Sequence, residues 1–146
     1  MIYTSYFAKL NSLPKNVIPI SICGKAPEWY NGAQYKKLAP KYDFFMEWKK
    51  SHDNDYYIKC FNKQVLDKLD YSHVYDELCD LAEEFVDALL EEDIRKQHQK
   101  LNFPYTIALI CYEKPSDFCH RHLVADWLNK NGILCEEYNF NKETEV

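Results

Sequence analysis

The sequence is poor in glycine and has no excess of positive charge, and both shortages narrow the functions open to it. Only three of its 146 residues are glycine, and neither a P-loop nor a GxGxxG phosphate-binding motif is present. The HExxH motif of zincins and the GxSxG motif of serine hydrolases are also missing. A formal net charge of −5 argues against a surface that holds extended duplex nucleic acid by its phosphates.

No part of the sequence resembles a membrane span or a secretory signal. No apolar run approaches the roughly 20 residues that a spanning helix needs, and the first ten residues, MIYTSYFAKL, lack a charged n-region and a cleavage site. We therefore expect a cytoplasmic protein with no membrane partner, in which the cysteines are reduced thiols rather than disulfides. The six cysteines stand at positions 23, 60, 79, 111, 119 and 135. The oligomeric state does not follow from these features.

Alternating strand and helix patterns predict a single α/β domain over residues 1–146. The last part is the clearest: a strand pattern at 106–112, a turn at 114–117, a helical pattern at 118–131, Gly132 just after the helix, and a strand pattern at 133–138. Such a βαβ unit implies parallel pairing with a right-handed crossover. We expect a three-layer, Rossmann-like fold with a mostly parallel, helix-flanked sheet, and a frayed tail at 141–146.

Earlier segments fit the same architecture. Strands are predicted at 2–7 and 17–22, although Pro19 weakens the second because proline cannot donate to a central ladder. Residues 25–40 read as an ordered loop of the kind that often carries function. Helices are predicted over 42–50, over 55–69, and from Ser72 as the N-cap to about Gln97, where the acidic face of the last helix is expected to be solvated.

Candidate site residues follow from the rule that parallel sheets bind ligands beyond the carboxyl ends of their strands. Three such ends can be named: Ser5 with Tyr6, the segment 23–25, and the segment 113–119. Ser116 or Asp117 is the expected N-cap of the helix after the third of these strands, which places Cys119 in the first turn.

Cys119 is a candidate nucleophile at that helix N-terminus. Aligned N–H groups stabilise a thiolate, and neighbouring His or Arg side chains lower the pKa of the thiol further. His120 or His122 would serve as general acid and base, and Glu113 would orient them. The alternative is that Cys119 is a small buried residue of the core, which is the common state of a free cysteine.

Arg121 adds positive charge where the helix dipole is already positive, so something negative should offset it. One interpretation is a bound phosphate or carboxylate, which makes Arg121 an anion clamp. The other is a structural partner, for which Glu113, Asp117 and Asp126 are candidates. Both can hold at once.

A metal site is the less favoured interpretation of the same segment. Cys111, Cys119, His120 and His122 offer zinc ligands, but positions 119, 120 and 122 diverge around a helix and no C-x-x-C pair exists. We therefore expect no metal and no cofactor, with Cys111 in the core at the end of a strand. His52, His73 and His98 are expected at the surface or at caps.

The loop at 25–40 interleaves aromatic and cationic residues. Lys25, Trp29 and Tyr30 could together contact a base and a phosphate, as single-strand binding sites do. The alternative is that the aromatic side chains pin the loop to the core, which is the interpretation we favour for Tyr35.

Four motifs give the chain a resemblance to the DUF488 family, a group named as a domain of unknown function, and in particular to its small subclade. They are IYTSYF at 2–7, IPISI at 18–22, KAPEWYNGAQYKKLAP at 25–40 and LICYEKPSDFCHRHLVADWL at 109–128. The resemblance implies an α/β fold with the Cys-His-Arg segment at 119–121 in the active site, and it implies no established activity. Two departures are Ser116, where the family leads us to expect glycine, and an acidic stretch at 83–100 that is longer than the usual connection.

These features lead to one main hypothesis and two rivals. The main hypothesis is a cytoplasmic enzyme that uses a Cys/His/Arg site at a helix N-terminus on a nucleotide or another phosphate-bearing small molecule. One rival is a non-catalytic module that binds a nucleotide or a single-stranded nucleic acid, and the other is a structural zinc site at Cys111 and Cys119.

Overall fold

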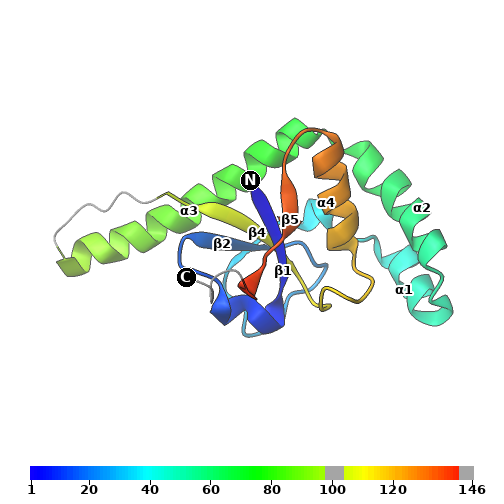
Figure 1. Ribbon diagram of the computed structural model, residues 1–146, viewed down its shortest axis with the longest axis horizontal. Helices are drawn as coiled ribbons and strands as arrows, with labels where there is room; N and C mark the ends of the chain where they lie inside the picture. Colours follow the sequence, from blue (N-terminus) through cyan, green and yellow to red (C-terminus); the bar gives the residue numbers. More distant parts are fainter. Residues whose placement is uncertain (98–103, 142–146) are drawn as a thin grey trace.

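A five-stranded sheet, in which every neighbouring pair is parallel, forms the centre of the computed structural model (Figure 1). The structure describes residues 1–97 and 104–141, without the side chains of 93–97. The strand order is β3-β2-β4-β1-β5, which confirms the α/β class and the parallel, helix-flanked sheet. Except for Asn141, the predicted frayed tail lies outside the described residues. The strands are β1 (Ile2–Tyr6), β2 (Val17–Ser21), β3 (Ala33–Gln34), β4 (Thr106–Cys111) and β5 (Cys135–Glu137).

The two faces of the sheet are covered differently. Helices α3 and α4 bury their apolar residues against one face, and the 3-10 helix η1 and the loop after β2 cover the other. Two long connections, from β3 to β4 and from β4 to β5, both move across the sheet toward the β5 edge. Because parallel crossovers share one handedness, the helices in these two connections lie on the same face. The third layer is therefore built from η1 and loops. The helices are η1 (Phe7–Ser12), η2 (Lys36–Leu38), α1 (Tyr42–Ser51), α2 (Asn54–Gln64), η3 (Leu66–Lys68), α3 (Tyr71–Gln97) and α4 (His120–Lys130).

Pro19 lies inside the sheet without breaking a ladder. The carbonyl of Asn16 accepts from the N–H of Thr106, and the N–H of Ile22 donates to the carbonyl of Ile110. Even-numbered residues of this segment therefore direct their backbone polar groups toward β4, and odd-numbered residues direct theirs toward β3. Pro19 thus points its nitrogen toward the short strand β3, which pairs only with Ile20 and Ser21. The second strand is confirmed, and the proline sits where no donor is needed.

Two predicted helix limits are wrong in this part of the chain. The helix expected to reach Leu69 ends at Gln64 and continues as η3, whose tighter turn buries both Val65 and Leu66. The cap of α3 is Asp70 rather than Ser72, because the Asp70 carboxylate accepts from the backbone N–H of Ser72 at 2.8 Å.

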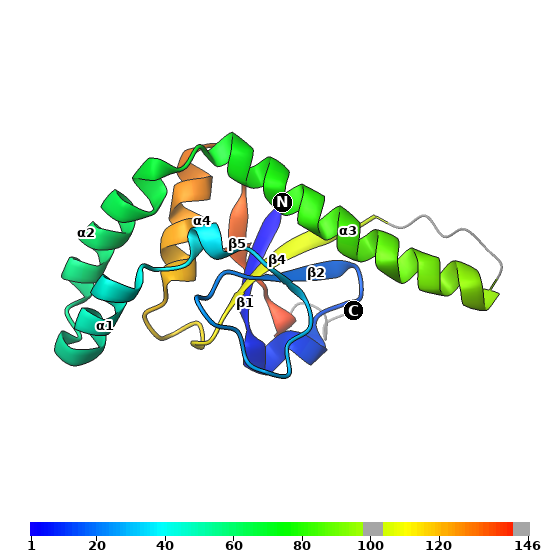
Figure 2. The ribbon, with the colours of Figure 1, turned by 180° about the vertical axis from the view of Figure 1, so that it is seen from behind.

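The loop expected at 25–40 contains the short strand β3 and the helix η2, so it completes one edge of the sheet. Figure 2 shows α3 extending beyond the sheet on one side, with α1 and α2 forming an arm on the other. No helix in the described part of the chain is both long and apolar enough to cross a bilayer.

Gly132 ends α4 in the left-handed region, with φ of 85°, as its position after the helix predicts. We expect Gly132→Ala to lower the free energy of unfolding by about 1–2 kcal/mol, because an L-residue resists this conformation. Chemical denaturation measures the loss. Gly24→Ala is the matched control, because an added Cβ there has no atom within 4 Å and φ is outside the left-handed region. Equal effects of the two substitutions would contradict the assignment.

Candidate functional site

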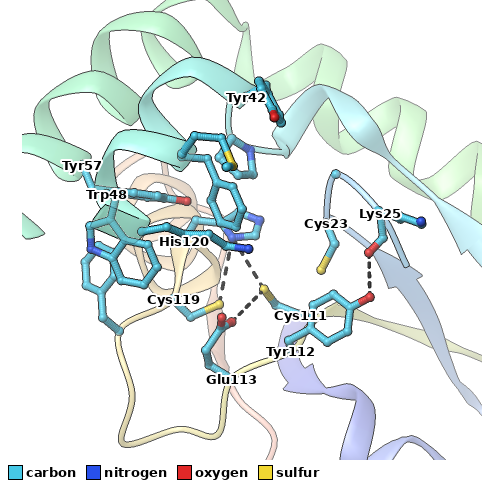
Figure 3. A pocket seen from close by; sticks show the side chains of 16 residues that line it. Cys23, Lys25, Tyr42, Trp48, Tyr57, Cys111, Tyr112, Glu113, Cys119 and His120 are labelled. Atoms are coloured by element: carbon cyan, nitrogen blue, oxygen red, sulfur yellow. Dashed lines mark hydrogen bonds between the residues drawn. The ribbon is translucent and has the colours of Figure 1, made fainter. Parts of the chain in front are cut away.

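A pocket of about 780 Å³ opens at the carboxyl ends of β2 and β4 (Figure 3). The loops that follow these two strands form one side, and the arm of α1 and α2 forms the other. Its position agrees with the general rule for parallel sheets. The lining residues are Cys23, Gly24, Lys25, Pro40, Tyr42, Phe45, Met46, Trp48, Lys49, Tyr57, Cys111, Tyr112, Glu113, Phe118, Cys119 and His120.

One wall of the pocket is aromatic. The rings of Trp48 and Phe118 lie 5.6 Å apart at 36°, and Tyr57 meets Phe118 edge-on at 5.0 Å. Such a packed set of rings presents a rigid apolar surface to a ligand. Burial raises the pKa of the Tyr57 phenol further above its ordinary value, so this side chain carries no charge at neutral or alkaline pH. Exposed Lys25 and Lys49 also line the pocket, and the ammonium of Lys49 lies 4.9 Å from the centre of the Phe45 ring.

The floor of the pocket is a thiol and imidazole cluster. His120 is 5% exposed, and its Nε2 lies 2.8 Å from the carbonyl oxygen of Ile22. A carbonyl only accepts, so Nε2 carries a proton, and in the tautomer that this contact selects Nδ1 holds the lone pair. That lone pair lies 3.5 Å from Sγ of Cys111 and 4.0 Å from Sγ of Cys119. Cys111 also donates to Glu113 Oε2 at 3.4 Å.

Both thiols are neutral in this arrangement. The hydrogen bond with Cys111 and burial raise the pKa of Cys119 far above its ordinary value, and the interaction with His120 opposes them only in part. For Cys111, the hydrogen bond with Cys119 lowers the pKa, but the bond with Cys23 and burial outweigh it and the net direction is upward. The prediction that the helix N-terminus lowers the pKa of Cys119 is therefore wrong, because proximity to a second thiol and burial dominate.

Cys119 is itself the N-cap of α4, with extended backbone at φ −154° and ψ 141°. The expected cap at Ser116 or Asp117 is thus wrong by two or three residues, and both side chains are exposed in the turn that precedes α4, outside the pocket lining. The turn tolerates Ser116 in place of glycine, because φ at this residue is not positive.

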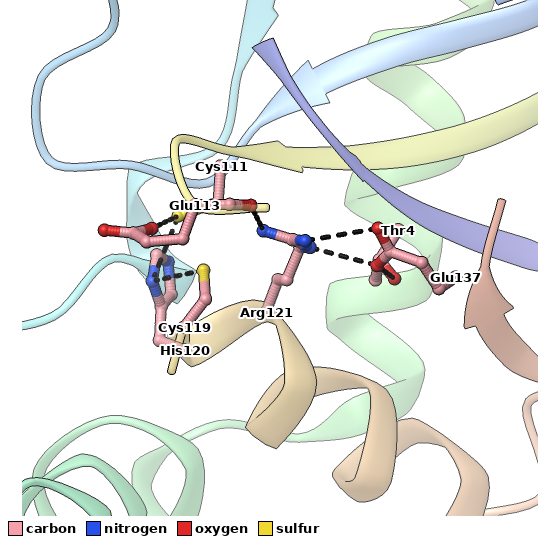
Figure 4. Close-up of polar contacts among 7 residues, drawn as sticks. All are labelled: Thr4, Cys111, Glu113, Cys119, His120, Arg121 and Glu137. Atoms are coloured by element: carbon pink, nitrogen blue, oxygen red, sulfur yellow. Dashed lines mark hydrogen bonds and ion pairs between the residues drawn. The ribbon is translucent and has the colours of Figure 1, made fainter. Parts of the chain in front are cut away.

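Arg121 faces the opposite side of α4 and is fully buried (Figure 4). Its Nε and Nη2 donate to the two carboxylate oxygens of Glu137 at 3.0 and 3.1 Å, and Nη1 donates to the carbonyl oxygen of Glu113. Thr4 donates to the same carboxylate at 2.7 Å. The carboxylate that balances the charge of Arg121 is therefore that of Glu137, and not that of Glu113, Asp117 or Asp126 as the sequence suggests. Glu113 contributes only its backbone carbonyl. Held in this way, the guanidinium has no access to the pocket.

Several other candidates also lie away from the pocket. Ser5 is 0% exposed with no partner for its hydroxyl, and the ring of Tyr6 lies 5.6 Å from the Arg121 guanidinium. Tyr30 is a pin for its own loop, because its hydroxyl donates to the Pro19 and Ala33 carbonyls at 3.2 and 2.7 Å. Trp29 is 58% exposed against Phe7.

His122 is partly buried on the first turn of α4 and does not line the pocket. Burial and the nearby Arg121 charge lower its pKa, and its Nε2 has no hydrogen-bond partner. Of the residues to which the sequence assigns a catalytic or substrate-binding role, Cys119, His120, Glu113 and Lys25 line the pocket.

Sequence reasoning places Cys23 at a candidate strand end and weighs Cys111 as a zinc ligand, but gives neither a role in the main hypothesis. Both line the pocket, at the ends of β2 and β4. The aromatic wall was missed, because Trp48 and Tyr57 lie far in the chain from Phe118 and no local pattern shows that they meet.

The comparisons with known proteins bear on this geometry. Residues 6–132 match the family model described as the active DUF488-N3 subclade. The chain belongs to the DUF488 family. The matched region contains the pocket-lining thiols and His120, together with the aromatic wall. No curated protein and no solved structure matches the chain.

The buried ion pair yields a prediction about stability. Arg121→Met leaves the Glu137 carboxylate and the Glu113 carbonyl without their partner, so we expect the free energy of unfolding to fall by about 3 kcal/mol. The low end of the usual range applies because the Glu137 side chain is 25% exposed. Chemical denaturation measures the change.

Lys37→Met is the matched control. It breaks the exposed pair of Lys37 with Glu77, whose side chains are 58% and 42% exposed, and should cost far less because solvent screens the pair. Similar losses for the two variants would show that Arg121 does not hold the fold.

Proposed function

We propose that this DUF488 protein is an enzyme in which Cys119 is the nucleophile and His120 is its general base. The observation that carries the proposal is the hydrogen bond from His120 Nε2 to Ile22, which aims the bare Nδ1 at the thiols on the pocket floor. The family description of an active subclade agrees with a catalytic role. The protein acts in the cytoplasm, where its thiols stay reduced.

A neutral thiol with a raised pKa needs a base at the moment of attack. In the proposed reaction, the Cys119 S–H proton moves to Nδ1 of His120 while sulfur bonds to an electrophilic carbon or phosphorus of the substrate. The bond to the leaving group breaks, and His120 returns the proton to that group. Because Cys111 can donate to Glu113, the Nδ1 lone pair remains free for Cys119.

The walls of the pocket suit a substrate with a flat ring and an anionic group. Rings stack well on the Trp48 and Phe118 surface, and Lys25 and Lys49 supply positive charge at the rim. We therefore propose a nucleotide or a related phosphate-bearing small molecule as substrate. In this proposal the lysines replace Arg121 as the contacts to the anion.

Alkylation tests the nucleophile. We expect iodoacetamide at neutral pH to label Cys119 slowly, because its thiol is buried and its pKa is raised. We expect His120→Asn to slow this labelling about 100-fold more, because the base is lost. Peptide mass spectrometry of protein sampled over time identifies the labelled residue and its rate. His73→Asn, on the exposed face of α3, is the control for loss of a histidine. If Cys119 stays unlabelled, or is labelled at the same rate in His120→Asn, the proposed role of Cys119 as nucleophile is wrong.

Ligand binding tests the substrate class. We expect nucleoside monophosphates to raise the melting temperature of the wild type, with a smaller rise in Lys49→Ala and at high salt, because a phosphate contact is lost or screened. Differential scanning fluorimetry measures the shift. Lys50→Ala removes a neighbouring exposed lysine that does not line the pocket, and should leave the rise intact.

The outcomes of the two experiments separate the alternatives. A nucleotide-dependent shift without Cys119 reactivity would favour the binding module over the enzyme. Equal shifts in Lys49→Ala and Lys50→Ala would remove Lys49 from the anion site.

A further inference from the structure

Cys111, Cys119 and His120 bring three potential metal ligands together on the pocket floor. Their two sulfur atoms and one nitrogen all lie within 4.8 Å of one another, and each residue is buried. Cys111 comes from the end of β4, while the other two come from the start of α4. The poor spacing along the sequence is overcome because the chain turns between residues 111 and 119.

The separations match the edges of a tetrahedral zinc site. Bond lengths of about 2.3 Å to sulfur and 2.0–2.1 Å to nitrogen require a sulfur-to-nitrogen separation of about 3.6 Å at the tetrahedral angle. The observed values are 3.5 Å for Cys111 and 4.0 Å for Cys119. The two sulfur-to-nitrogen separations are thus within a few tenths of an ångström of the required value, and the two sulfur atoms lie within 4.8 Å of each other.

The contact from His120 to Ile22 is an independent sign of a ligand. Metal-binding histidines almost always donate their other ring N–H to a carbonyl or carboxylate, which fixes the tautomer and aims the free nitrogen. Here Nε2 donates to the Ile22 carbonyl at 2.8 Å, and Nδ1 faces the sulfur atoms. The imidazole is thus already held in the tautomer and orientation that a cation needs.

We infer that Cys111, Cys119 and His120 bind a thiophilic divalent cation of the Zn²⁺ class, with the fourth position open to the pocket. Binding releases the two thiol protons to solvent, and the two thiolates neutralise the charge of the cation. All three ligands line the same pocket, so the remaining position faces it and takes water or a ligand atom.

The site has a consequence for the proposed reaction. A cation bound by Nδ1 of His120 occupies the one lone pair of the proposed base, and it also draws electron density from the Cys119 sulfur, so metal binding and base-assisted thiol catalysis exclude each other. This regulatory part rests on the proposed function, while the metal site itself rests only on the arrangement of the three ligands.

Cobalt titration tests the site. Metal-free wild type, kept reduced without added thiols, should bind one Co²⁺ with the absorption of sulfur-to-cobalt charge transfer, and Zn²⁺ should displace it. Cys111→Ser should weaken binding by more than the roughly 10–100-fold that loss of a supporting contact costs. Cys135→Ser is the matched control, because Cys135 is equally buried at 3% exposure and lies on β5, away from the pocket.

Each outcome has a distinct meaning. The absence of a one-to-one cobalt band in the wild type, or an equal band in Cys111→Ser, would overturn the metal site. Equal weakening in Cys135→Ser would also overturn it, since the effect would then be one of folding.

Alkylation in the presence of Zn²⁺ tests the regulatory part separately. Saturating Zn²⁺ should protect Cys119 from iodoacetamide in the wild type but not in Cys111→Ser, which retains Cys119 and His120. Labelling of the wild type that Zn²⁺ does not change would overturn the exclusion. If Cys119 remains unlabelled even without metal, the proposed nucleophile fails, and the cobalt band still decides the metal site.

Discussion

The guanidinium of Arg121 joins three parts of the chain, namely α4, β5 and the segment that follows β4. It binds the Glu137 carboxylate on β5 and the Glu113 carbonyl after β4, and it projects from the first turn of α4. Thr4 of β1 donates to the same carboxylate. Removing such a charge from water is costly, so the arrangement persists only because each partner is in place. The pair therefore fixes the start of α4 relative to the sheet, and with it the positions of Cys119 and His120.

His120 and Arg121 are adjacent in the sequence but lie in different environments. His120 faces the pocket and Arg121 faces the interior of the fold, because successive helical residues are rotated by about 100°. The charge of Arg121 at the helix N-terminus is balanced by Glu137 on the interior side, and the pocket side holds neutral thiols beside the imidazole of His120. Chemistry at this site consequently requires either proton transfer within the cluster or a cation that converts the thiols to thiolates.

Much of the architecture could be predicted from the sequence, because it depends on local patterns. The strand runs, Gly132 after α4 and the βαβ unit all follow from periodicity and turn chemistry, and the carboxyl ends of the strands locate the site. The order of side chains around α4 could not be predicted as well. An N-cap at residue 116 or 117 instead of Cys119 starts the helix too early. The residues that face the pocket can then not be told from those that face the interior.

The other features that the sequence could not predict depend on contacts between residues distant in the chain. Glu137 meets Arg121 across 16 residues, and no spacing rule connects them. The aromatic wall combines Trp48 of α1, Tyr57 of α2 and Phe118 of the turn before α4, whose contact depends on how the arm packs. Tyr30 was open to two interpretations, and its two bonds to backbone carbonyls favour the structural one.

The aromatic wall and the floor of the pocket come from different parts of the sequence. Residues 40–57 supply much of the aromatic wall, while the reactive groups come from the loop after β2 and from the segment between β4 and α4. Mutations in the first stretch can reshape the space for a ligand without moving Cys119, His120 or the buried Arg121 pair. The shape of this space and the groups on its floor can therefore be changed independently of each other by mutation.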